Sequence, residues 1–393
     1  MTAVAFDIAS LESRTAEILA RLVAFDTTSH KSNIPLVDYV RDYLAGHGIA
    51  SDLIPTEDGE KASLVATIGP ANAGGVGLSG HTDVVPARAE DWSSDPFRLD
   101  VRDGRYWGRG TADMKGFVAC VLAMAPEYQR LDLREPIHIL LSYDEEIGCI
   151  GVRPMIAEMG LRLPRPRIVI VGEPTGMAVV DAHKGPVRWS ADFTGRAAHS
   201  SMAHIGVNAI TFAGEFLAEL QRIENELRTR YPDPRFDPPY PTLQVTRIDG
   251  GTASNIIPVT CRVGFEVRAT RALDIDTLDA KFRAFAEHVL LPRMRAIAPE
   301  AAIDIARQNS VPAFQSEAGS EAVALALALT RQNETFGVSY ATEAGLFQDA
   351  GAATVVCGPG HIAQAHTADE WIDEAEIRKC LAFLARLGDW AAR

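Results

Sequence analysis

The stretch Gly80-His81-Thr82-Asp83-Val84-Val85-Pro86 decides the fold, because it ends a buried strand and presents an imidazole and a carboxylate. Just before it, residues 75–78 alternate glycine with apolar side chains, as is typical of a short buried strand. In an open parallel sheet, ligands bind beyond the carboxyl ends of the strands. His81 and Asp83 follow such an end, although one histidine and one aspartate alone are weak evidence for a metal site.

Ligand-type side chains recur in four further turns, which carry Asp113, the adjacent pair Glu145 and Glu146, Glu173, and His366. Three of these turns follow near-continuous apolar runs, as expected of strands covered on both faces: residues 136–143, 167–171 and 353–356. Helical periodicity at residues 11–23 (with Ser10 as N-cap), 33–46, 117–128, 317–329 and 373–387 completes an α/β pattern. Each turn alone is more often ordinary solvated turn chemistry, but their joint position beyond buried runs favours one shared site.

The composition excludes several classes of protein. A chain of 393 residues is expected to form two or three domains, and its net charge of −14 argues against nucleic acid as a partner. It has no uninterrupted apolar run long enough to predict a membrane span, and Met1–Ser10 lacks the basic start of a signal peptide. The five cysteines are too scattered for a disulfide framework or a zinc knuckle. We therefore expect a cytoplasmic protein.

The pattern changes near His183, where strands with one polar face begin. Residues 187–193, 241–247, 259–268 and 302–306 are predicted strands, and 208–227 and 278–294 are predicted helices. This βαββαβ order is that of a ferredoxin-like domain, and α/β segments resume after it. We expect an inserted domain at 183–311 within a catalytic domain formed by 1–182 and 312–393.

The mixture of two imidazoles and several carboxylates suits zinc or a similar divalent ion. It exceeds what one tetrahedral catalytic zinc needs, and it suits two ions bridged by a carboxylate and a water of lowered pKa. Glu145 and Glu146 are adjacent, so one can bind metal while the other acts as general base. Asp83 is placed to hold the second nitrogen of His81. The ligands do not distinguish zinc from cobalt or manganese.

The motifs GHTDVVP, GRGTADMKG, DEEIGCIG, GEPT and AHTADE, in this order, resemble those of the cocatalytic zinc deacetylases, desuccinylases and aminoacylases. The resemblance implies a zinc-exopeptidase-like, mostly parallel sheet flanked by helices, with the inserted domain as a lid that forms a homodimer. It implies the following roles: His81 and Glu173 bind one zinc, Glu146 and His366 the other, Asp113 bridges, Glu145 is the general base and Asp83 orients His81.

Three residues of the inserted domain gain a role only through this resemblance. His199, in Gly195-Arg196-Ala197-Ala198-His199-Ser200, is implied to reach the scissile carbonyl across the dimer, and Asn255 and Arg268 to bind the substrate carboxylate. Without the resemblance, His199 is an ordinary exposed loop histidine and Arg268 half of a surface ion pair. His361 stands where a small residue is expected, and we interpret it as lining the pocket.

The implied activity is a metal-dependent amidohydrolase that removes an acyl group from a small N-acyl amino acid. Stretches such as Phe25-Asp26-Thr27-Thr28-Ser29 and Ala341-Thr342-Glu343-Ala344 favour the branch acting on N2-acetyl-L-ornithine in arginine biosynthesis. Glu343 is expected to pair with the free ammonium of that substrate, or else to lie in a surface loop. Succinyl-diaminopimelate desuccinylase, a broader aminoacylase or dipeptidase, and a catalytically silent metal-binding homologue remain alternatives; the last would show the loss of Glu145 or a ligand.

Overall fold

The computed structural model describes residues 6–70 and 74–393, so the start of the Met1–Ser10 segment lies outside the described residues. The chain forms two compact units. The first comprises Met1–Ala182, Ser316–Phe336 and Thr342–Arg393, and the second His183–Gln315 and Gly337–Ala341. The sequence-based division placed the insertion at 183–311. Two short strands, β13 (Phe314–Gln315) and β14 (Phe336–Val338), occur where the chain passes between the units.

The helices of the first unit are α1 (Ile8–Val23), α2 (Ile34–Gly46), α3 (Gly116–Gln129), α4 (Val152–Glu158), α8 (Glu321–Thr330), α9 (Ala344–Asp349) and α10 (Glu374–Ala391). Its strands are β1 (Ser51–Pro55), β2 (Ala62–Ile68), β3 (Val76–His81), β4 (Asp100–Arg102), β5 (Arg105–Trp107), β6 (Ile137–Ser142), β7 (Ile168–Pro174), β8 (Val180–His183), β15 (Ala353–Gly358) and β16 (Trp371–Asp373). Two short helical turns are η1 (Ala89–Asp91) and η2 (Thr111–Lys115).

Within the first unit, the strands of the main sheet follow the order β1-β2-β6-β3-β7-β15-β8. Its centre is parallel, since β3 pairs in parallel with β6 and β7, and β15 with β7. The flanking pairs β1–β2, β2–β6 and β8–β15 are antiparallel. Every residue of β3, β6 and β7 is buried, as expected of parallel strands covered on both faces. The predicted α/β class is confirmed, and the sheet, expected to be mostly parallel, is mixed.

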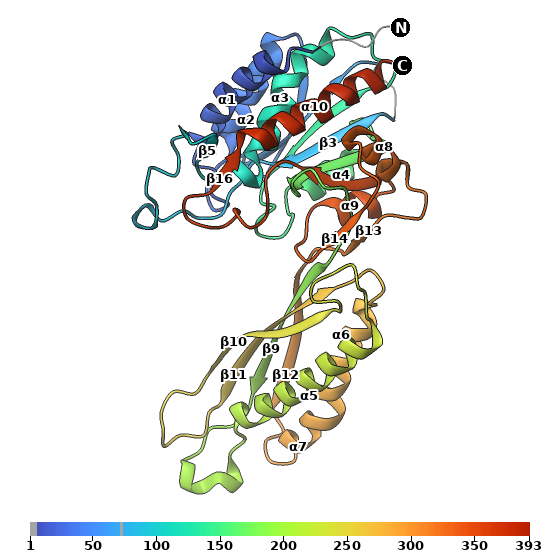
Figure 1. Cartoon of the computed structure of the whole chain (residues 1–393). Coiled ribbons are helices and arrows are strands. Elements are labelled where there is room, and N and C mark those ends of the chain that lie inside the picture. Colours follow the sequence, from blue (N-terminus) through green and yellow to red (C-terminus); the bar gives the residue numbers. More distant parts are fainter. Residues whose placement is uncertain (1–5, 71–73) are drawn as a thin grey trace. The chain divides into compact units, whose positions relative to one another are not determined.

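Helices α1, α3 and α10 pack on one another, which brings the N-terminal helix beside the C-terminal one (Figure 1). The predicted N-cap of α1 is wrong. Asp7, not Ser10, caps the helix, because an Asp7 carboxylate oxygen accepts a hydrogen bond from the main-chain N–H of Ser10. The buried face of α1 repeats at helical spacing: Leu11, Thr15, Ile18, Leu19, Leu22 and Val23.

The segment 86–110 contains two short strands. β4 and β5 pair with β16 in a small antiparallel sheet of order β16-β5-β4. Strands of three residues are too short to show periodicity in a sequence. Their pairing brings the segment before Asp113 next to the segment after His366, and this proximity matters for the site.

The second unit contains β9 (Gly185–Thr194), α5 (Ala209–Arg230), β10 (Thr242–Gly250), β11 (Thr260–Ala269), α6 (Ile275–Phe285), α7 (Leu291–Arg295) and β12 (Ala302–Ser310), with the turns η3 (Ser200–Ile205) and η4 (Ala286–Leu290). Its sheet is antiparallel, in the order β10-β11-β9-β12. The predicted βαββαβ order is therefore present. Aromatic side chains fill the core between sheet and helices, with Phe265 stacked on Trp189 and edge-on to Phe216 and Phe282.

Candidate metal centre and active site

The ligand-type residues of the first unit collect at the carboxyl ends of the parallel strands. His81 is the last residue of β3 and lies in register with Ser142, the last residue of β6. Glu145 and Glu146 follow β6, and Glu173 belongs to the end of β7. Parallel strands in register place these three turns side by side, at the edge where open α/β sheets bind ligands.

Asp113 lies between two imidazoles contributed by different loops. Its Oδ1 is 3.1 Å from Nε2 of His81, and its Oδ2 is 3.3 Å from Nε2 of His366. The same His366 nitrogen is 2.9 Å from Oε2 of Glu146, and His81 Nε2 is 3.8 Å from Oε1 of Glu173. One carboxylate thus faces two half-sites, each with an imidazole and a second carboxylate.

These residues fit a pair of divalent cations. Ligand atoms of His81, Asp113 and Glu146 lie within 4.8 Å of one another, as do those of His81, Glu145 and Glu173. Oε1 of Glu146 is buried and has no hydrogen-bond partner among the described residues. A buried, unpartnered carboxylate oxygen is costly unless a cation or donor meets it, and oxygen with imidazole nitrogen is the donor set of zinc, cobalt and manganese.

Crowding of acidic groups perturbs the carboxyl pKa values at the site. Burial raises the pKa of Glu145 and Glu173 well above the usual range, and nearby carboxylates raise both further. Burial and the neighbouring Asp113 also raise the pKa of Glu146. A bound cation would relieve this repulsion, so the arrangement favours binding positive charge.

The same acidic neighbours favour the charged form of the two imidazoles at the site. Burial alone would lower the pKa of His81, but its contact with Asp113 and the charge of Glu173 raise it well above the usual value. Contacts with Asp113 and Glu146 raise the pKa of His366 to about 10. Burial acts to raise the pKa of Asp113, but its contacts with His366 and His81 have the larger effect. The net result is a lowered pKa of Asp113. Without metal, the acidic neighbours therefore favour protonated imidazoles. A bound cation would have to displace those protons from the ring nitrogens.

The expected role of Asp83 needs a correction. Nδ1 of His81 lies 2.9 Å from the main-chain carbonyl oxygen of Asp83, whereas the nearest carboxylate oxygen of Asp83 is 3.6 Å away. The carboxylate instead accepts hydrogen bonds from the main-chain N–H groups of Glu145 (3.0 Å) and Glu146 (3.3 Å) and from the Ser29 hydroxyl (2.7 Å). Asp83 therefore holds His81 through its backbone and the Glu145–Glu146 turn through its side chain.

Glu343 is placed differently from both expectations. It is 1 % exposed, so it is not a surface-loop carboxylate. Ser79 of β3 donates a hydrogen bond to one carboxylate oxygen at 3.0 Å, and Ser142 of β6 donates to the other. Burial raises the pKa of Glu343. With both oxygens engaged inside the protein, this placement does not support direct pairing with a substrate ammonium.

A family model described as Peptidase family M20/M25/M40 matches residues 77–389. The chain belongs to peptidase family M20/M25/M40. The resemblance inferred from the motifs is thereby confirmed, and the chain is a hydrolase of this family. None of the expected metal-ligating residues is missing, nor is Glu145, so no lost residue supports a catalytically silent homologue.

Relatives of this M20 hydrolase are similar over nearly their whole length. An acetylornithine deacetylase from Proteus mirabilis (strain HI4320) is 34 % identical over 365 residues, covering 93 % of this chain and 92 % of that protein. An acetylornithine deacetylase from Myxococcus xanthus is 35 % identical over 373 residues, covering 94 % and 95 %.

Solved structures share the fold. Aminopeptidase PepT from Bacillus cereus ATCC 10987 gives a TM-score of 0.76 at 19 % identity, covering 97 % of this chain and 99 % of that one. A dinuclear metal binding peptidase of the M20 family from Bacillus subtilis gives a TM-score of 0.69 at 16 % identity, covering 97 % and 98 %. None of the described helices of the present hydrolase is long and apolar enough to span a bilayer.

The remaining predicted site residues of the M20 chain lie in the second unit. His199 and Asn255 belong to neighbouring segments, since Ser200 N–H donates to the main-chain carbonyl of Asn255 at 3.0 Å. Nδ1 of His199 accepts a hydrogen bond from the main-chain N–H of Ser201 at 3.3 Å and lies 2.8 Å from the Ser201 hydroxyl oxygen. Both side chains are exposed.

Arg268 lies on β11 and is half-buried. Its Nε donates to Oε1 of Glu266 at 2.7 Å, and Arg188 donates to the other oxygen of the same carboxylate. The two arginines share one counter-ion, so Arg268 retains guanidinium N–H groups beyond this ion pair. His361, expected to line the pocket, is exposed, and its ring lies against Gly176.

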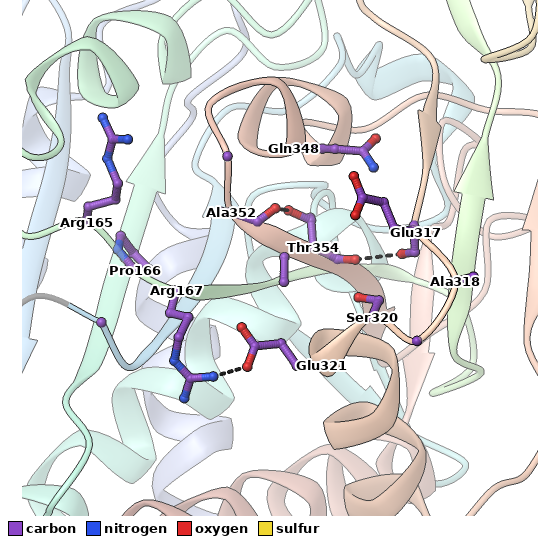
Figure 2. Close-up of a pocket in the computed structure, with 15 residues that line it drawn as sticks. Arg165, Pro166, Arg167, Glu317, Ala318, Ser320, Glu321, Gln348, Ala352 and Thr354 are labelled. Carbon is purple, nitrogen blue, oxygen red and sulfur yellow. Dashed lines mark hydrogen bonds and ion pairs between the residues drawn. The ribbon is translucent and has the colours of Figure 1, made fainter.

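A cavity of about 680 Å³ in the first unit lies at the opposite edge of the sheet, where β7 and β15 begin (Figure 2). Its lining includes Arg165, Arg167, Glu317, Glu321 and Gln348. Arg167 and Glu321 form an ion pair across it. None of the metal-type residues lines this cavity, and the amino ends of parallel strands are not where such sheets bind ligands, so we do not assign it to catalysis.

Sequence reasoning missed the residues that hold the site in place. Ser29 supports Asp83, Ser79 and Ser142 support Glu343, and Glu370 contacts the loop that carries Asp113. Two of them stood in motifs already noted, Ser29 in the segment 25–29 and Glu370 at the end of the His366 motif. The identity of these residues gave no signal, because serine and glutamate are common residues both in strands and in loops.

Proposed function

We propose that this M20 hydrolase is a metal-dependent amidohydrolase that converts N2-acetyl-L-ornithine to L-ornithine and acetate, as a step of arginine biosynthesis. The observation that carries the reaction class is Asp113, whose two oxygens lie 3.1 Å from His81 and 3.3 Å from His366. The specific substrate is supported by the 34 % identity, over 93 % of this chain, to an acetylornithine deacetylase.

We assign His81 and Glu173 to one divalent ion, Glu146 and His366 to the other, and Asp113 to a bridging position. We propose zinc as the native metal ion. The same donors also suit cobalt or manganese. When bound, two such ions supply Lewis acidity that lowers the pKa of water and polarises the amide carbonyl.

Glu145 is the proposed general base. It accepts the proton of the attacking water and passes it to the nitrogen of the leaving amine, which leaves as the ornithine amino group. Its burial raises its pKa, and a base works best when its pKa approaches the working pH. The Cys149 thiol donates to Oε1 of Glu145 at 3.3 Å, and Asp83 holds the Glu145 main chain, so the carboxylate has a defined position.

His199, Asn255 and Arg268 complete the proposal from the second unit. A ring N–H of His199 is proposed to donate to the carbonyl oxygen as negative charge develops there. Arg268 and Asn255 are proposed to bind the substrate α-carboxylate, for which a guanidinium fork is well suited.

We also propose that the second unit forms a homodimer and that His199 acts on the partner's site. β10 is an edge strand of its sheet and exposes Val245 (39 %) and Ile248 (49 %). An edge strand with exposed apolar side chains is a surface that pairs readily with a second chain. This feature supports a dimer through the second unit.

The experiment that tests the substrate compares kcat/KM of purified, metal-replete protein on N2-acetyl-L-ornithine, N-succinyl-diaminopimelate and N-acetylmethionine. We expect acetylornithine to be preferred. Preference for the succinyl compound would replace the proposed substrate by that of a desuccinylase, and equal rates on acetylornithine and acetylmethionine would indicate a broad aminoacylase. Hydrolysis of none of the three would overturn the amidohydrolase proposal.

A further inference from the structure

Glu370 is a buried carboxylate of the first unit that the catalytic proposal does not use. It is 1 % exposed and follows His366 by four residues along the chain. A buried ionised carboxylate is stable only when its oxygens are well supplied with donors or a counter-ion. The groups that donate hydrogen bonds to the Glu370 carboxylate belong to one segment, residues 108–113, which ends in Asp113.

The side chain of Glu370 binds that segment through both oxygens. Oε2 accepts from the main-chain N–H of Gly110 (2.9 Å) and from the Arg109 guanidinium (2.6 Å). Oε1 accepts from the main-chain N–H groups of Ala112 (2.9 Å) and Asp113 (3.1 Å). Successive N–H groups that converge on an anion form a nest, and here the anion is a side chain of the same protein.

The backbone of Glu370 contributes a further contact. Its carbonyl oxygen accepts from the main-chain N–H of Gly108 at 2.9 Å. Gly110 has a φ of +86°, and a Cβ there would lie 2.8 Å from Val84, so the loop conformation depends on glycine. The nest is therefore a fixed conformation of residues 108–113, and Glu370 supplies the acceptors that satisfy it.

The segment that carries Glu370 is itself anchored. Oδ1 of Asp369 accepts hydrogen bonds from the main-chain N–H and the hydroxyl of Ser93, at 2.8 and 3.0 Å. The short segment 366–370 thus presents His366 to the site at one end and holds the Asp113 loop at the other. Glu370 therefore connects the position of His366 to that of the Asp113 loop.

We propose that Glu370 is a positioning residue that sets the orientation of Asp113 between His81 and His366, and so ties the two halves of the metal centre together. This inference rests on the metal centre proposed above. Glu370 contacts no reacting atom. It acts through the backbone of Asp113, whose N–H it binds, and through the short chain that joins it to His366.

The test replaces Glu370 by glutamine, which preserves shape but turns one acceptor oxygen into an N–H donor that faces backbone N–H groups. Metal-free wild type and Glu370→Gln are titrated with Mn²⁺, and binding is followed by calorimetry and by electron paramagnetic resonance. We expect wild type to bind two ions per chain with a spin-coupled signal. In Glu370→Gln the second ion should bind about 10- to 100-fold more weakly, the cost typical of lost support around metal ligands, and the coupled signal should fall.

Three controls separate positioning from general stabilisation. Asp279→Asn makes the same chemical change in the second unit, where Asp279 accepts from Trp189 and Arg283, and it should leave both ions bound. Arg109→Lys removes the guanidinium but retains the nest, so it should keep the coupled signal. Glu370→Asp retains the charge and should restore part of the affinity for the second ion. This variant also provides the test if Glu370→Gln does not fold.

The possible outcomes are distinct. A folded Glu370→Gln with two ions at wild-type affinity and coupling would overturn the inference, as would an equal defect in Arg109→Lys. If Glu370→Gln does not fold, Glu370→Asp with wild-type affinity and coupling would overturn it. Failure of the wild type to bind two ions would instead overturn the proposed metal centre.

Discussion

One carboxylate oxygen of Asp83 accepts a hydrogen bond from the main-chain N–H of Glu145 at 3.0 Å. The other oxygen accepts from Glu146 N–H at 3.3 Å and from the Ser29 hydroxyl at 2.7 Å. A single carboxylate thus fixes two adjacent residues whose side chains diverge. Glu146 meets His366 at 2.9 Å, whereas Glu145 accepts from the Cys149 thiol at 3.3 Å. This divergence underlies the assignment of one glutamate to metal and the other to proton transfer.

We predict opposite effects of glutamine at these two positions. Glu145→Gln should retain two ions per chain and lower kcat by at least about a hundredfold, as expected for a lost general base. Glu146→Gln should lose metal, because it removes a charged ligand. Metal content by inductively coupled plasma mass spectrometry, measured beside kcat, distinguishes them. Loss of metal from the Glu145 variant with retention in the Glu146 variant would mean that the two roles are exchanged.

Metal binding should release protons near neutral pH. The pKa of His366 is raised to about 10, so its ring carries a proton in the metal-free protein at pH 7. Burial acts to lower the pKa of His81, but the contact with Asp113 and the charge of Glu173 raise it, which favours a proton on that ring as well. A cation must displace these protons, so its apparent affinity should fall as pH falls, by about tenfold per pH unit for each proton released.

Calorimetric titration with Zn²⁺ in two buffers of different ionisation enthalpy measures this release. His366→Ala is the matched control and should release fewer protons than wild type. A binding heat that does not depend on the buffer would contradict the predicted protonation of the imidazoles.

Glu343→Ala should impair hydrolysis without changing substrate preference. Its two oxygens are engaged by Ser79 and Ser142 inside the sheet, so its loss should disturb the site equally for every substrate. The measurement is kcat/KM on N2-acetyl-L-ornithine and on N-acetylmethionine, in wild type and variant. We expect both values to fall by the same factor. A selective loss on acetylornithine would restore the original expectation that Glu343 recognises the ammonium.

Subunits carrying different lesions should complement one another. If His199 acts on the partner's site, a hybrid dimer of His199→Ala and Glu145→Gln subunits contains one site with both native residues. Mixed protein should then be clearly more active than either variant alone. Native mass spectrometry establishes that hybrids have formed. Hybrid dimers without added activity would show that His199 serves its own chain.

The strand ends were predictable because buried apolar runs and ligand-type turns are local features of the sequence. The turns of His81, Glu145 and Glu173 could therefore be placed from residue patterns alone. The residues that support them could not. Ser29 and Asp83 are 54 positions apart, and Ser79 and Glu343 are 264 apart, so only the folded chain reveals each pair.

The remaining differences between prediction and structure concern the N-cap of α1, the three-residue strands and Glu343. Asp7 and Ser10 are both good capping residues, and the helix begins early enough for Asp7 to cap it. Strands β4, β5 and β16 are three residues long, so their pairing depends on contacts made across the chain rather than on periodicity. The segment around Glu343 gave no sign of burial. Its carboxylate is buried because it contacts Ser79 and Ser142 on strands distant in the sequence.

The most direct test of the two-ion amidohydrolase is the rate of N2-acetyl-L-ornithine hydrolysis as Zn²⁺ is added stepwise to metal-free protein. Asp113 faces both His81 and His366, so we predict no activity without metal and a maximum at two equivalents per chain. A rate that is already maximal at one equivalent would contradict the bridged pair. Hydrolysis by fully metal-free protein would contradict metal-dependent catalysis altogether.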